Sequence, residues 1–356
     1  TNLNYNYLRD YDPEIGRYTA PDPITSGGHV SPYIYVSNNP LMNIDPLGLY
    51  QIDVHYYMTF FLAITAGVDQ ERARIIALAT QYIDDNSITS PTPDGLNPSS
   101  MAHNQAALDR YHFVQATYDP PRTVVQKLYH SLFGSDTEEY IINRIKNPSS
   151  PQLGRLLTAS IFSKSDINAT CESSDQLFGE YLHSLEDTFA HRDQQNEPYT
   201  SQTAGLGAGH AIDGKNPDFT YNHFSLMPGL GYWGTNEART LEMEKEVFSA
   251  LTFRTTYGTK STKFPGIEKI LKDFNKFEAS DTDIEQGKLQ EKIAILSTGL
   301  ITLGYGGIDM SFGSGKHGYD SKKAAEIRER SLATLNPENY VGTILPKGAA
   351  PLPEKK

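Results

Sequence analysis

Cysteine is almost absent from this chain, because Cys171 is the only one in 356 residues. A single cysteine forms no disulfide framework within a chain and builds no thiolate metal site. Any metal ion would therefore be held by histidine and carboxylate side chains, a ligand set that favours zinc, manganese or iron.

Positive charge is also in deficit. The sequence has 31 Lys and Arg against 43 Asp and Glu, a formal net charge of −12. Binding to phosphate backbones depends on Lys and Arg patches, so this balance argues against a general nucleic-acid binder. It is still compatible with a nuclease whose positive charge comes from bound metal ions.

Long apolar runs and a leader sequence are missing as well. No run approaches the ~18 apolar residues typical of a transmembrane helix. The start, Thr1-Asn-Leu-Asn, has neither the basic region nor the apolar region of a secretory signal. We therefore expect a fragment that begins within a longer protein and is long enough for two domains.

The stretch with the clearest chemistry is Gly179-Glu-Tyr-Leu-His-Ser-Leu-Glu-Asp-Thr-Phe-Ala-His191. It places His183, Asp187 and His191 at i, i+4 and i+8, which stack on one face of an α-helix over two turns. Buried polar groups need partners, and a divalent cation is the simplest partner for this set. The alternative is a polar stripe on the surface, although such a face more often carries Lys and Glu. Apolar residues at the other positions support the helix: Leu182, Leu185 and Phe189.

The pattern of the chain predicts a mainly α protein, with one all-helical domain over residues 50–340. Apolar residues at helical spacing run from Tyr56 to about Ile83, with a break near Gly67 and Asp69 as the cap of the second piece. No internal repeat is found in residues 50–356. Loops are predicted at 86–100 and 201–235, and a Pro-rich, mobile tail at 341–356. Further helices are predicted near residues 101–117, 121–133, 136–147, 151–163, 174–192, 236–251, 266–277, 283–301 and 318–335.

Residues 1–49 differ in composition from the rest of the chain. They are rich in Tyr, Asn, Pro and Gly, with short β-like runs separated by turns. From Tyr7-Leu-Arg-Asp-Tyr-Asp-Pro-Glu to the closing Ile44-Asp-Pro-Leu-Gly-Leu49, the segment resembles the C-terminal end of an Rhs/YD-repeat core. The resemblance covers residues 4–49. It implies a short β-rich remnant of a shell that encloses a variable C-terminal toxin.

The same resemblance implies self-cleavage just after the Asp-Pro-X-Gly-Leu signature, here after Leu49. Arg9, Asp22 and Asp45 are the positions that match the self-cleavage residues of that family. The alternative is that these three are only turn residues of the β-shell.

Histidine and aspartate gather near the predicted helix ends and in the Gly-rich loop. The order His, Asp at a helix end, His, His-x-x-x-Asp and later His is similar to the all-helical zinc-dependent phospholipase C and single-strand nuclease superfamily. The blocks that carry the resemblance are His-Tyr-Tyr-x-Thr, Gln-Tyr-x-Asp-Asp and Leu-His-x-x-x-Asp-Thr-x-x-His, over roughly residues 50–250. The resemblance implies a metal-dependent hydrolase with up to three zinc ions, or another divalent metal, bound by His55, Asp85, His103, His183 and Asp187. Further candidate metal ligands are His191, His210 and His223.

The bridging carboxylate of such a centre would be Asp187 or Asp85. His191 follows Asp187 by only four residues, which is shorter than the spacing usual in that superfamily. One or two ions therefore stay open as alternatives to three. His183, Asp187 and His191 form a ladder on the predicted helix. Glu186 and Asp193 are its neighbours in sequence, and they could orient ligands or transfer protons, or be surface charge.

The remaining acidic residues and histidines rank lower. Asp84, Asp53 and Asp213 are weaker metal candidates. We interpret the other histidines as ordinary structural or surface residues, or as part of the shell: His112, His130, His317 and His29.

Cleavage after Leu49 would make Tyr50 a free N-terminus five residues before His55. In the zinc phospholipase and nuclease superfamily, the mature N-terminal α-amino group is itself a metal ligand. The hypothesis is that self-cleavage makes Tyr50 a ligand and completes the site. Alternatively, Asp53 supplies the same coordination without any cut.

Together the resemblances imply a delivered effector of interbacterial competition that acts in a target cell. Its toxin domain would be a phosphodiesterase, a phospholipase C-like enzyme acting on membrane lipids, with a nuclease as the alternative. The acidic chain modestly favours lipid, since a nuclease usually keeps a basic groove. A third alternative is a non-enzymatic, membrane-acting or binding toxin with a structural metal. A toxin also implies a cognate immunity protein.

Overall fold

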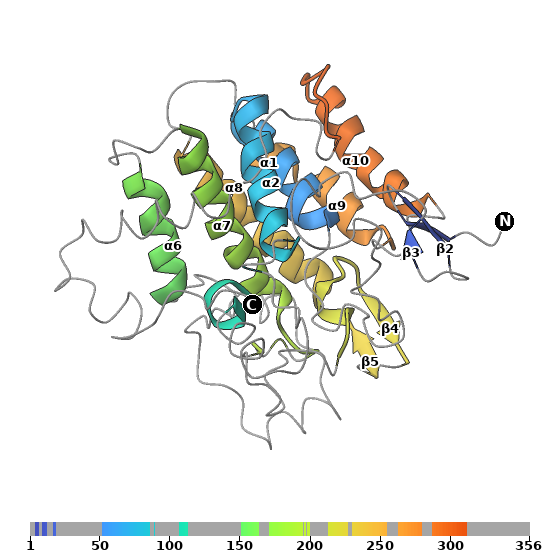
Figure 1. Ribbon diagram of the computed structural model, residues 1–356. Helices are drawn as coiled ribbons and strands as arrows, with labels where there is room; N and C mark the ends of the chain where they lie inside the picture. Colours follow the sequence, from blue (N-terminus) through green and yellow to red (C-terminus); the bar gives the residue numbers. More distant parts are fainter. Residues whose placement is uncertain are drawn as a thin grey trace.

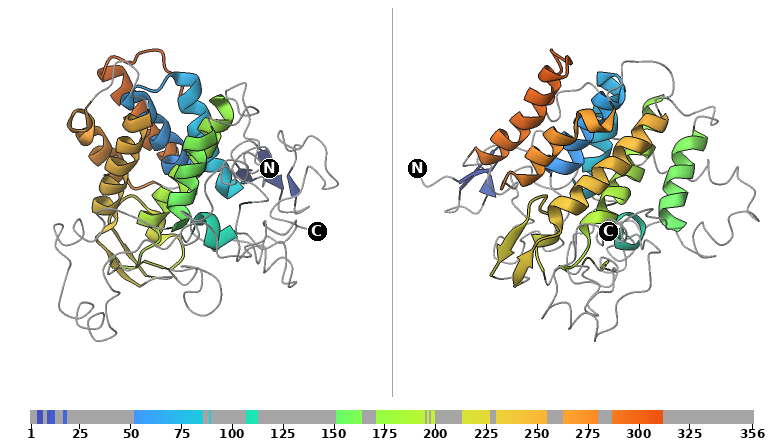
Figure 2. Two further views of the ribbon diagram at one scale, coloured as in Figure 1. Left: turned by 90° about the vertical axis from the view of Figure 1, so that its left-hand side faces the viewer. Right: turned by 180° about the vertical axis from the view of Figure 1, so that it is seen from behind.

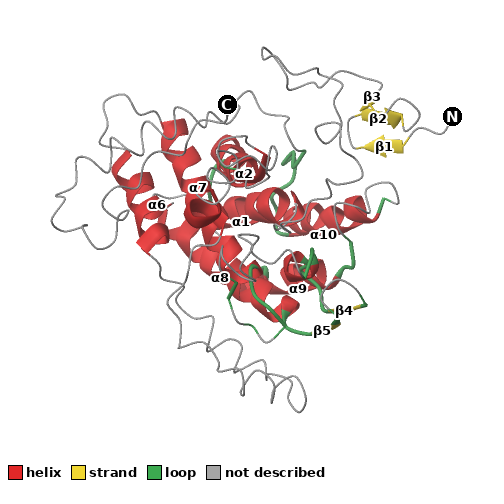
Figure 3. Cartoon of the chain, turned by 60° about the horizontal axis from the view of Figure 1, so that its bottom comes forward, coloured by secondary structure: helices red, strands yellow, loops and turns green. Residues whose placement is uncertain are grey.

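Helix α7, which carries the His183/Asp187/His191 ladder, lies inside a bundle of helices that includes α2, α6 and α8 (Figure 1). Two further views show the same arrangement (Figure 2), and helices dominate the described residues in Figure 3. The prediction of a mainly α protein is confirmed. The computed structural model describes residues 4–6, 9–12, 17–18, 52–85, 89, 107–112, 151–163, 171–194, 196, 198–199, 213–226, 230–254, 263–279 and 287–311.

The elements have the following bounds. The α-helices are α1 Thr59–Ala66, α2 Gln70–Asp85, α6 Pro151–Phe162, α7 Cys171–Ala190, α8 Asn236–Arg254, α9 Glu268–Lys276 and α10 Lys288–Thr302. Two π-helical segments span Asp53–Met58 (η2) and Leu108–His112 (η3), and two 3₁₀ turns span Asn216–Asp218 (η6) and Phe264–Gly266 (η7). The strands are β1 Asn4–Asn6, β2 Arg9–Asp12, β3 Arg17–Tyr18, β4 His223–Ser225 and β5 Gly231–Trp233.

The break between α1 and α2 has the predicted cause. Gly67 ends α1 with a φ of +96°, a left-handed conformation that glycine adopts without strain. Asp69 then accepts a hydrogen bond from the backbone N–H of Arg72 at 3.1 Å, which caps the start of α2. Both predictions about this turn are confirmed.

Helices α2 and α7 run in the same direction and touch closely along their length. Arg72 on α2 pairs with Asp175 on α7, and Asp84 lies 3.6 Å from His183 further along. Between these contacts, a Cβ on Gly179 would come within 2.5 Å of the Ile76 carbonyl oxygen. A glycine is therefore needed where the two backbones approach most closely, and this approach brings Asp84 to the ladder.

The predicted Gly-rich loop 201–235 is partly wrong, because it contains the β4–β5 hairpin. Its register pairs His223 with Trp233, Phe224 with Tyr232 and Ser225 with Gly231. Cross-strand aromatic pairs stabilise such a short hairpin despite its glycines. The domain is thus not all-helical, although helices dominate it.

At the N-terminus, β1, β2 and β3 form an antiparallel sheet, in agreement with the β-like runs predicted there. The rest of the predicted β-rich segment, residues 19–49, lies outside the described residues. So do the helices predicted near 121–133, 136–147 and 318–335, and the tail.

The hydrophobic core forms around α1, which is buried along its whole length. The helices α7, α8, α9 and α10 add apolar residues, among them Leu182, Val247, Phe274 and Leu296. Among the residues that the structure describes, every helix is too short or too polar to span a bilayer. The core therefore fixes the apolar side of α7 and of η2. These two elements carry the candidate ligands His55, His183 and Asp187.

Candidate metal centre

The ladder on α7 is buried. His183 and Asp187 have no exposed surface, and His191, directly after the helix end, is 3% exposed. The alternative of a solvated surface stripe is therefore wrong. Buried on both its polar and its apolar side, α7 must find partners for the ladder inside the protein.

Three other elements supply those partners. The η2 segment brings His55, the last turn of α2 brings Asp84, and η3 brings His112. His55 and His112 have at most 1% exposed surface, and the Asp84 side chain is 9% exposed. The cluster is thus assembled from four separate segments of the chain.

Asp187 stands at the middle of the cluster. Its Oδ2 lies 3.1 Å from His112 Nδ1, 3.2 Å from His183 Nε2 and 3.9 Å from His191 Nε2. Its Oδ1 faces the other way, 3.5 Å from His55 Nε2. One carboxylate therefore has its two oxygens directed at two different sets of imidazoles.

The two carboxylate oxygens of Asp84 also face different imidazoles. Its Oδ2 lies 3.6 Å from His55 Nε2, whereas its Oδ1 lies 3.6 Å from His183 Nε2 and 3.7 Å from His112 Nδ1. Asp84 and Asp187 thus each present one oxygen to His55 and one to the pair His112 and His183. Carboxylates placed between imidazoles in this way are suited to hold a divalent cation.

The outward nitrogens of three imidazoles contact oxygen atoms of the surrounding protein. His55 Nδ1 lies 2.7 Å from Glu186 Oε2, His112 Nε2 lies 3.1 Å from the Thr89 carbonyl oxygen, and His191 Nδ1 lies 2.8 Å from the His112 carbonyl oxygen. A neutral imidazole that donates its one N–H outward presents a lone pair inward, which is how metal-ligating histidines are oriented.

Glu186 has a partner besides His55. The Thr59 hydroxyl donates a hydrogen bond to Glu186 Oε1 at 2.6 Å, so this carboxylate is held from both sides. The prediction that Glu186 could orient a ligand agrees with this geometry. The alternative of surface charge is wrong, because Glu186 is fully buried.

Burial sets the protonation of the ladder. It lowers the pKa of His183 to about 3 and that of His191 to about 4, so both imidazoles are neutral near pH 7. The pKa of His55 is raised well above its usual value, because its contacts with Asp187, Glu186 and Asp84 outweigh the effect of burial. A divalent cation bound to the cluster would take the place of the His55 proton and leave this imidazole neutral as a ligand.

The donor atoms are spaced as a metal site requires. Ligands bound at about 2.0–2.1 Å to one tetrahedral ion lie about 3.3 Å from one another. The inward contacts here run from 3.1 Å, between His112 Nδ1 and Asp187 Oδ2, to 3.9 Å, between His191 Nε2 and Asp187 Oδ2. In the described part of the chain, the residue groups able to hold a metal are His55/His183/Asp187 and Asp84/His112/His183. The residues therefore fit a divalent cation with nitrogen and oxygen ligands.

One predicted ligand, His223, has neighbours outside the cluster. His223 Nε2 is 2.8 Å from Asn216 Oδ1, and its ring lies against Tyr221 and Trp233. Its neighbours are therefore those of a structural histidine.

The weaker acidic candidates also have other partners. Asp53 Oδ2 forms a buried ion pair with Lys292 Nζ at 2.7 Å, so it is not positioned to replace an N-terminal amino ligand. Asp213 accepts a hydrogen bond from the Tyr199 hydroxyl, and burial together with the charge of Asp213 raises the pKa of Tyr199. Asp193, after the ladder, is partly exposed and its backbone carbonyl accepts a hydrogen bond from Asn196.

Several predicted residues lie outside the part of the chain that the structure describes. Arg9 belongs to β2 and Asp85 ends α2, but their side chains are not among those described. The others are Asp22, Asp45, Leu49, Tyr50, His103 and His210, together with His29, His130 and His317.

Sequence reasoning ranked Asp84 too low and missed His112, which is buried in the cluster and is no surface histidine. For Asp84 a signal existed: it follows Ile76 and Thr80 at intervals of four residues, on the helix face that meets α7. For His112 the only signal was its place four residues after the apolar Leu108 in a predicted helix.

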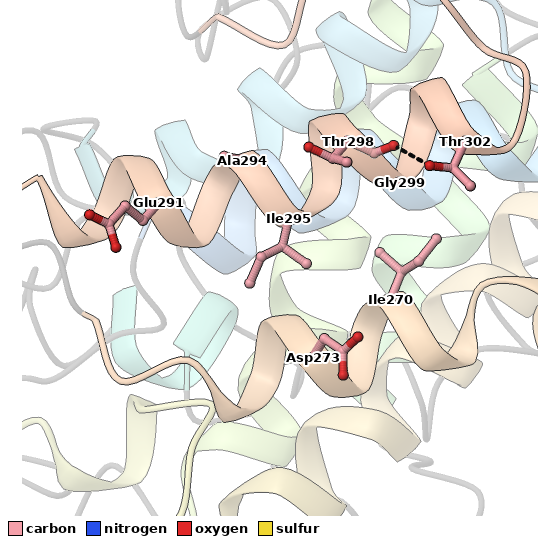
Figure 4. Close-up of a pocket in the computed structure, with 8 residues that line it drawn as sticks. All are labelled: Ile270, Asp273, Glu291, Ala294, Ile295, Thr298, Gly299 and Thr302. Atoms are coloured by element: carbon pink, nitrogen blue, oxygen red, sulfur yellow. Dashed lines mark hydrogen bonds between the residues drawn. The ribbon is translucent and has the colours of Figure 1, made fainter.

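The pocket in Figure 4 does not coincide with this cluster. It has a volume of about 450 Å³ and lies between α9 and α10. Its lining shares no residue with the metal centre: Ile270, Asp273, Glu291, Ala294, Ile295, Thr298, Gly299 and Thr302.

Comparison with known proteins identifies the domain that holds the cluster. A family model described as "Family of unknown function (DUF6765)" matches residues 50–299, more than half of the chain. The chain belongs to the DUF6765 family. The DUF6765 match contains every residue of the cluster. No solved structure matches the chain.

Curated relatives of this DUF6765 protein match over short segments only. The toxin protein Tse5 of Pseudomonas aeruginosa is 49% identical over 47 residues, 13% of this chain and 4% of Tse5. The probable deoxyribonuclease RhsA of Dickeya dadantii is 53% identical over 47 residues, 13% of this chain and 3% of RhsA. The double-stranded DNA deaminase toxin A of Burkholderia cenocepacia is 45% identical over 49 residues, 14% of this chain and 3% of that protein. The chain thus spans only a few per cent of these relatives, and the matches support its resemblance to Rhs-associated toxins.

Proposed function

We propose that this chain is the C-terminal part of an Rhs-associated effector and that its DUF6765 domain is a metal-dependent phosphoesterase toxin. The toxin assignment is supported by the short matches to proteins named as toxins and Rhs proteins. The chemical assignment is supported by the buried cluster of histidines and aspartates, which fits a divalent metal.

One observation carries the proposal. Asp84 and Asp187 each direct one oxygen at His55 and the other at His112 and His183. We assign a two-ion centre to this geometry, which would be held by Asp84, Asp187, His55, His112, His183 and His191. Neutral imidazoles and carboxylates are ligands that zinc prefers, so zinc is the metal proposed.

The chain's own residues have defined tasks in this centre. Bound divalent ions would supply Lewis-acid chemistry, which activates water and neutralises phosphate charge. Glu186 holds the ring of His55 so that Nε2 points inward, and the Thr59 hydroxyl fixes Glu186. The carbonyl oxygens of Thr89 and His112 hold the rings of His112 and His191 in the same way. These contacts pre-organise the ligands before any ion arrives.

Phospholipid is the first proposed substrate and nucleic acid is the second. The net charge of −12 supports lipid, because nucleic-acid enzymes usually keep a basic approach surface. The names of two relatives, a probable deoxyribonuclease and a DNA deaminase, favour nucleic acid. Both substrates contain the phosphodiester group on which such a centre acts.

Metal analysis followed by substrate assays tests the proposal. We expect about two zinc ions per chain, metal-dependent release of diglyceride or head group from phosphatidylcholine vesicles, and loss of both properties in His183→Ala. Cleavage of single-stranded DNA or RNA in place of lipid would select the nuclease. A folded protein that binds no divalent metal and cleaves neither substrate would overturn the proposal. Metal binding without cleavage, with toxicity unchanged in His183→Ala, would indicate a structural metal in a non-enzymatic toxin.

Self-cleavage after Leu49 is part of this proposal. The DUF6765 match begins at residue 50, the first residue after the proposed cut, which supports a boundary there. A freed Tyr50 amino group would be a further metal ligand, because the alternative, Asp53, is paired with Lys292. An Asp22→Asn chain blocks the proposed cleavage and tests the role of Tyr50. Full metal content and full activity in the uncut protein would exclude Tyr50 as a required ligand.

The remaining partners follow from the toxin assignment. The Rhs shell of the same polypeptide would enclose the domain before delivery into a target cell. A cognate immunity protein would protect the producing cell. Co-expression of the chain with a candidate immunity protein, and the survival of the producing cells, tests this last point.

A further inference from the structure

The β4–β5 hairpin exposes an unusual amount of apolar surface. Seven large apolar side chains are exposed among the described residues, and four of them belong to this hairpin and its flanks. Their exposed fractions are 63% for Phe224, 74% for Leu226, 67% for Leu230 and 62% for Tyr232. Exposed apolar groups that gather in one place mark an interaction surface.

The hairpin presents these side chains on one face. Phe224 and Tyr232 are register partners, so their rings project from the same side of the two strands. The opposite side carries Trp233, which is fully buried and stacked on His223 with ring centroids 6.3 Å apart. The inner face thus anchors the hairpin to the protein, and its outer face stays in contact with solvent.

Charge is absent from this part of the chain. Residues 219–236 contain no Asp, Glu, Lys or Arg, although charged residues make up 21% of the sequence. Burying such a segment in a membrane interface removes no ionised side chain from water, and aromatic residues such as Tyr and Trp favour that interface.

The size of the patch favours a membrane over a protein partner. Phe and Tyr side chains each bury about 150–250 Å² when fully covered, so these four partly covered residues offer on the order of 400–500 Å². A stable protein interface needs about 800 Å² on each partner. A hairpin tip is too small for that, whereas a lipid interface requires only that a few apolar side chains enter it.

The hairpin is connected to the metal centre. Gln194, three residues after His191, donates a hydrogen bond to the Leu230 carbonyl oxygen at 3.0 Å. The hairpin lies at the same end of the bundle as η3 and the C-terminal end of α7 (Figures 1 and 2). A membrane in contact with the hairpin would therefore lie at the end of the molecule that contains the cluster.

We propose that the β4–β5 hairpin is a membrane-binding element that inserts Phe224, Leu226, Leu230 and Tyr232 into the lipid interface. Membrane binding follows from the hairpin alone. Its consequence, that the centre acts on phospholipid head groups, rests on the proposed function.

Vesicle co-sedimentation of the full chain in EDTA tests binding without any need for activity. We expect the chain to bind vesicles of phosphatidylethanolamine and phosphatidylglycerol. The Phe224→Ser/Tyr232→Ser and Leu226→Ser/Leu230→Ser variants should each bind about tenfold more weakly or worse. The matched control is Phe253→Ser/Ile301→Ser, which removes two side chains that are 76% and 67% exposed on α8 and α10. The control should bind like the unmodified chain.

A second measurement needs no substitution. Trp233 is the only tryptophan of the chain and adjoins Tyr232, so brominated lipids should quench its fluorescence when the chain is bound. Vesicle-bound protein with unquenched Trp233 would show that another segment inserts.

Three results would overturn the proposal: no binding by the unmodified chain, equal loss in the control variant, or a dimer that the hairpin substitutions convert to a monomer. The last would make the patch an interface between copies. Hydrolysis of a soluble phosphodiester, bis(p-nitrophenyl) phosphate, separates this proposal from the proposed function. Binding without hydrolysis would refute only the latter, whereas hydrolysis without binding would refute only the hairpin.

Discussion

Two buried aspartates on the same helix have opposite surroundings. Asp175, near the start of α7, receives two hydrogen bonds from the Arg72 guanidinium at 2.8 and 2.9 Å and another from Arg254 at 3.2 Å. Asp187, three turns further along, has nitrogens of four imidazoles within 4 Å of its carboxylate oxygens. Both side chains have at most 1% exposed surface.

The two aspartates differ in the charge that their partners carry at neutral pH. A guanidinium is always charged and forms a permanent bidentate pair with a carboxylate, so Asp175 is complete within the protein. Burial keeps His183 and His191 neutral, so these two imidazoles beside Asp187 offer lone pairs and no charge. One end of α7 therefore forms a complete ion pair, and the other end has ligands that fit a cation.

The largest expected effect is that of Asp187→Asn. An amide cannot bridge two cations, so we expect loss of the bound metal and a fall of about 10³-fold or more in phosphodiester cleavage. The fold should persist, because the change removes a buried negative charge. Metal analysis and circular dichroism of the purified variant check both parts. If the Asp187→Asn variant kept its metal, Asp187 would not differ from Asp175 in its role in metal binding.

The matched substitution Asp175→Asn should have the reverse profile. It removes one partner of a buried ion pair and leaves Arg254 without its carboxylate, so the free energy of unfolding should fall by about 3 kcal/mol. Metal content per folded molecule should stay unchanged. Urea unfolding measures the stability, and loss of metal from the folded variant would contradict the assignment of Asp175 to the fold.

A third substitution tests the contact that joins the two ends. Gly179→Ala adds a Cβ at 2.5 Å from the Ile76 carbonyl oxygen and 2.6 Å from the Ala79 Cβ, so α2 and α7 must separate. We expect about 2 kcal/mol of lost stability, and weaker metal binding because Asp84 moves away from His183. Gly154→Ala on α6 is the control, since an added Cβ there meets nothing within 4 Å. That change should stabilise the protein slightly. If Gly179→Ala and Gly154→Ala changed the free energy of unfolding equally, the close approach of α2 and α7 at Gly179 would not be the cause.

The smallest expected effect is that of Glu186→Gln. The amide keeps the shape of the side chain but weakens the hold on His55 Nδ1, so metal affinity should fall about tenfold, equivalent to about 1.4 kcal/mol. Competition with a fluorescent zinc chelator measures the affinity. An unchanged affinity would show that Thr59 and Glu186 do not orient His55.

The sequence alone predicted the ladder because His183, Asp187 and His191 follow one another at helical spacing, which can be recognised within a short segment. His55 was found through a local block of residues as well. Asp84 and His112 were misjudged because their roles depend on which face of α2 meets α7 and on where η3 lies. The same limit applies to the hairpin: its Gly- and Pro-rich sequence indicates a loop, and only the pairing of Phe224 with Tyr232 reveals strands.

By itself the sequence determined that the protein is mainly helical, that any metal must bind to histidine and carboxylate groups, and that His183, Asp187 and His191 share one face. These follow from composition and from the 3.6-residue period. Only the tertiary structure decided that this face is buried, that Asp84 and Asp187 divide their oxygens between two groups of imidazoles, and that Asp53 pairs with Lys292 instead. Those results depend on the parallel approach of α2 to α7 across Gly179, a contact between residues about a hundred positions apart.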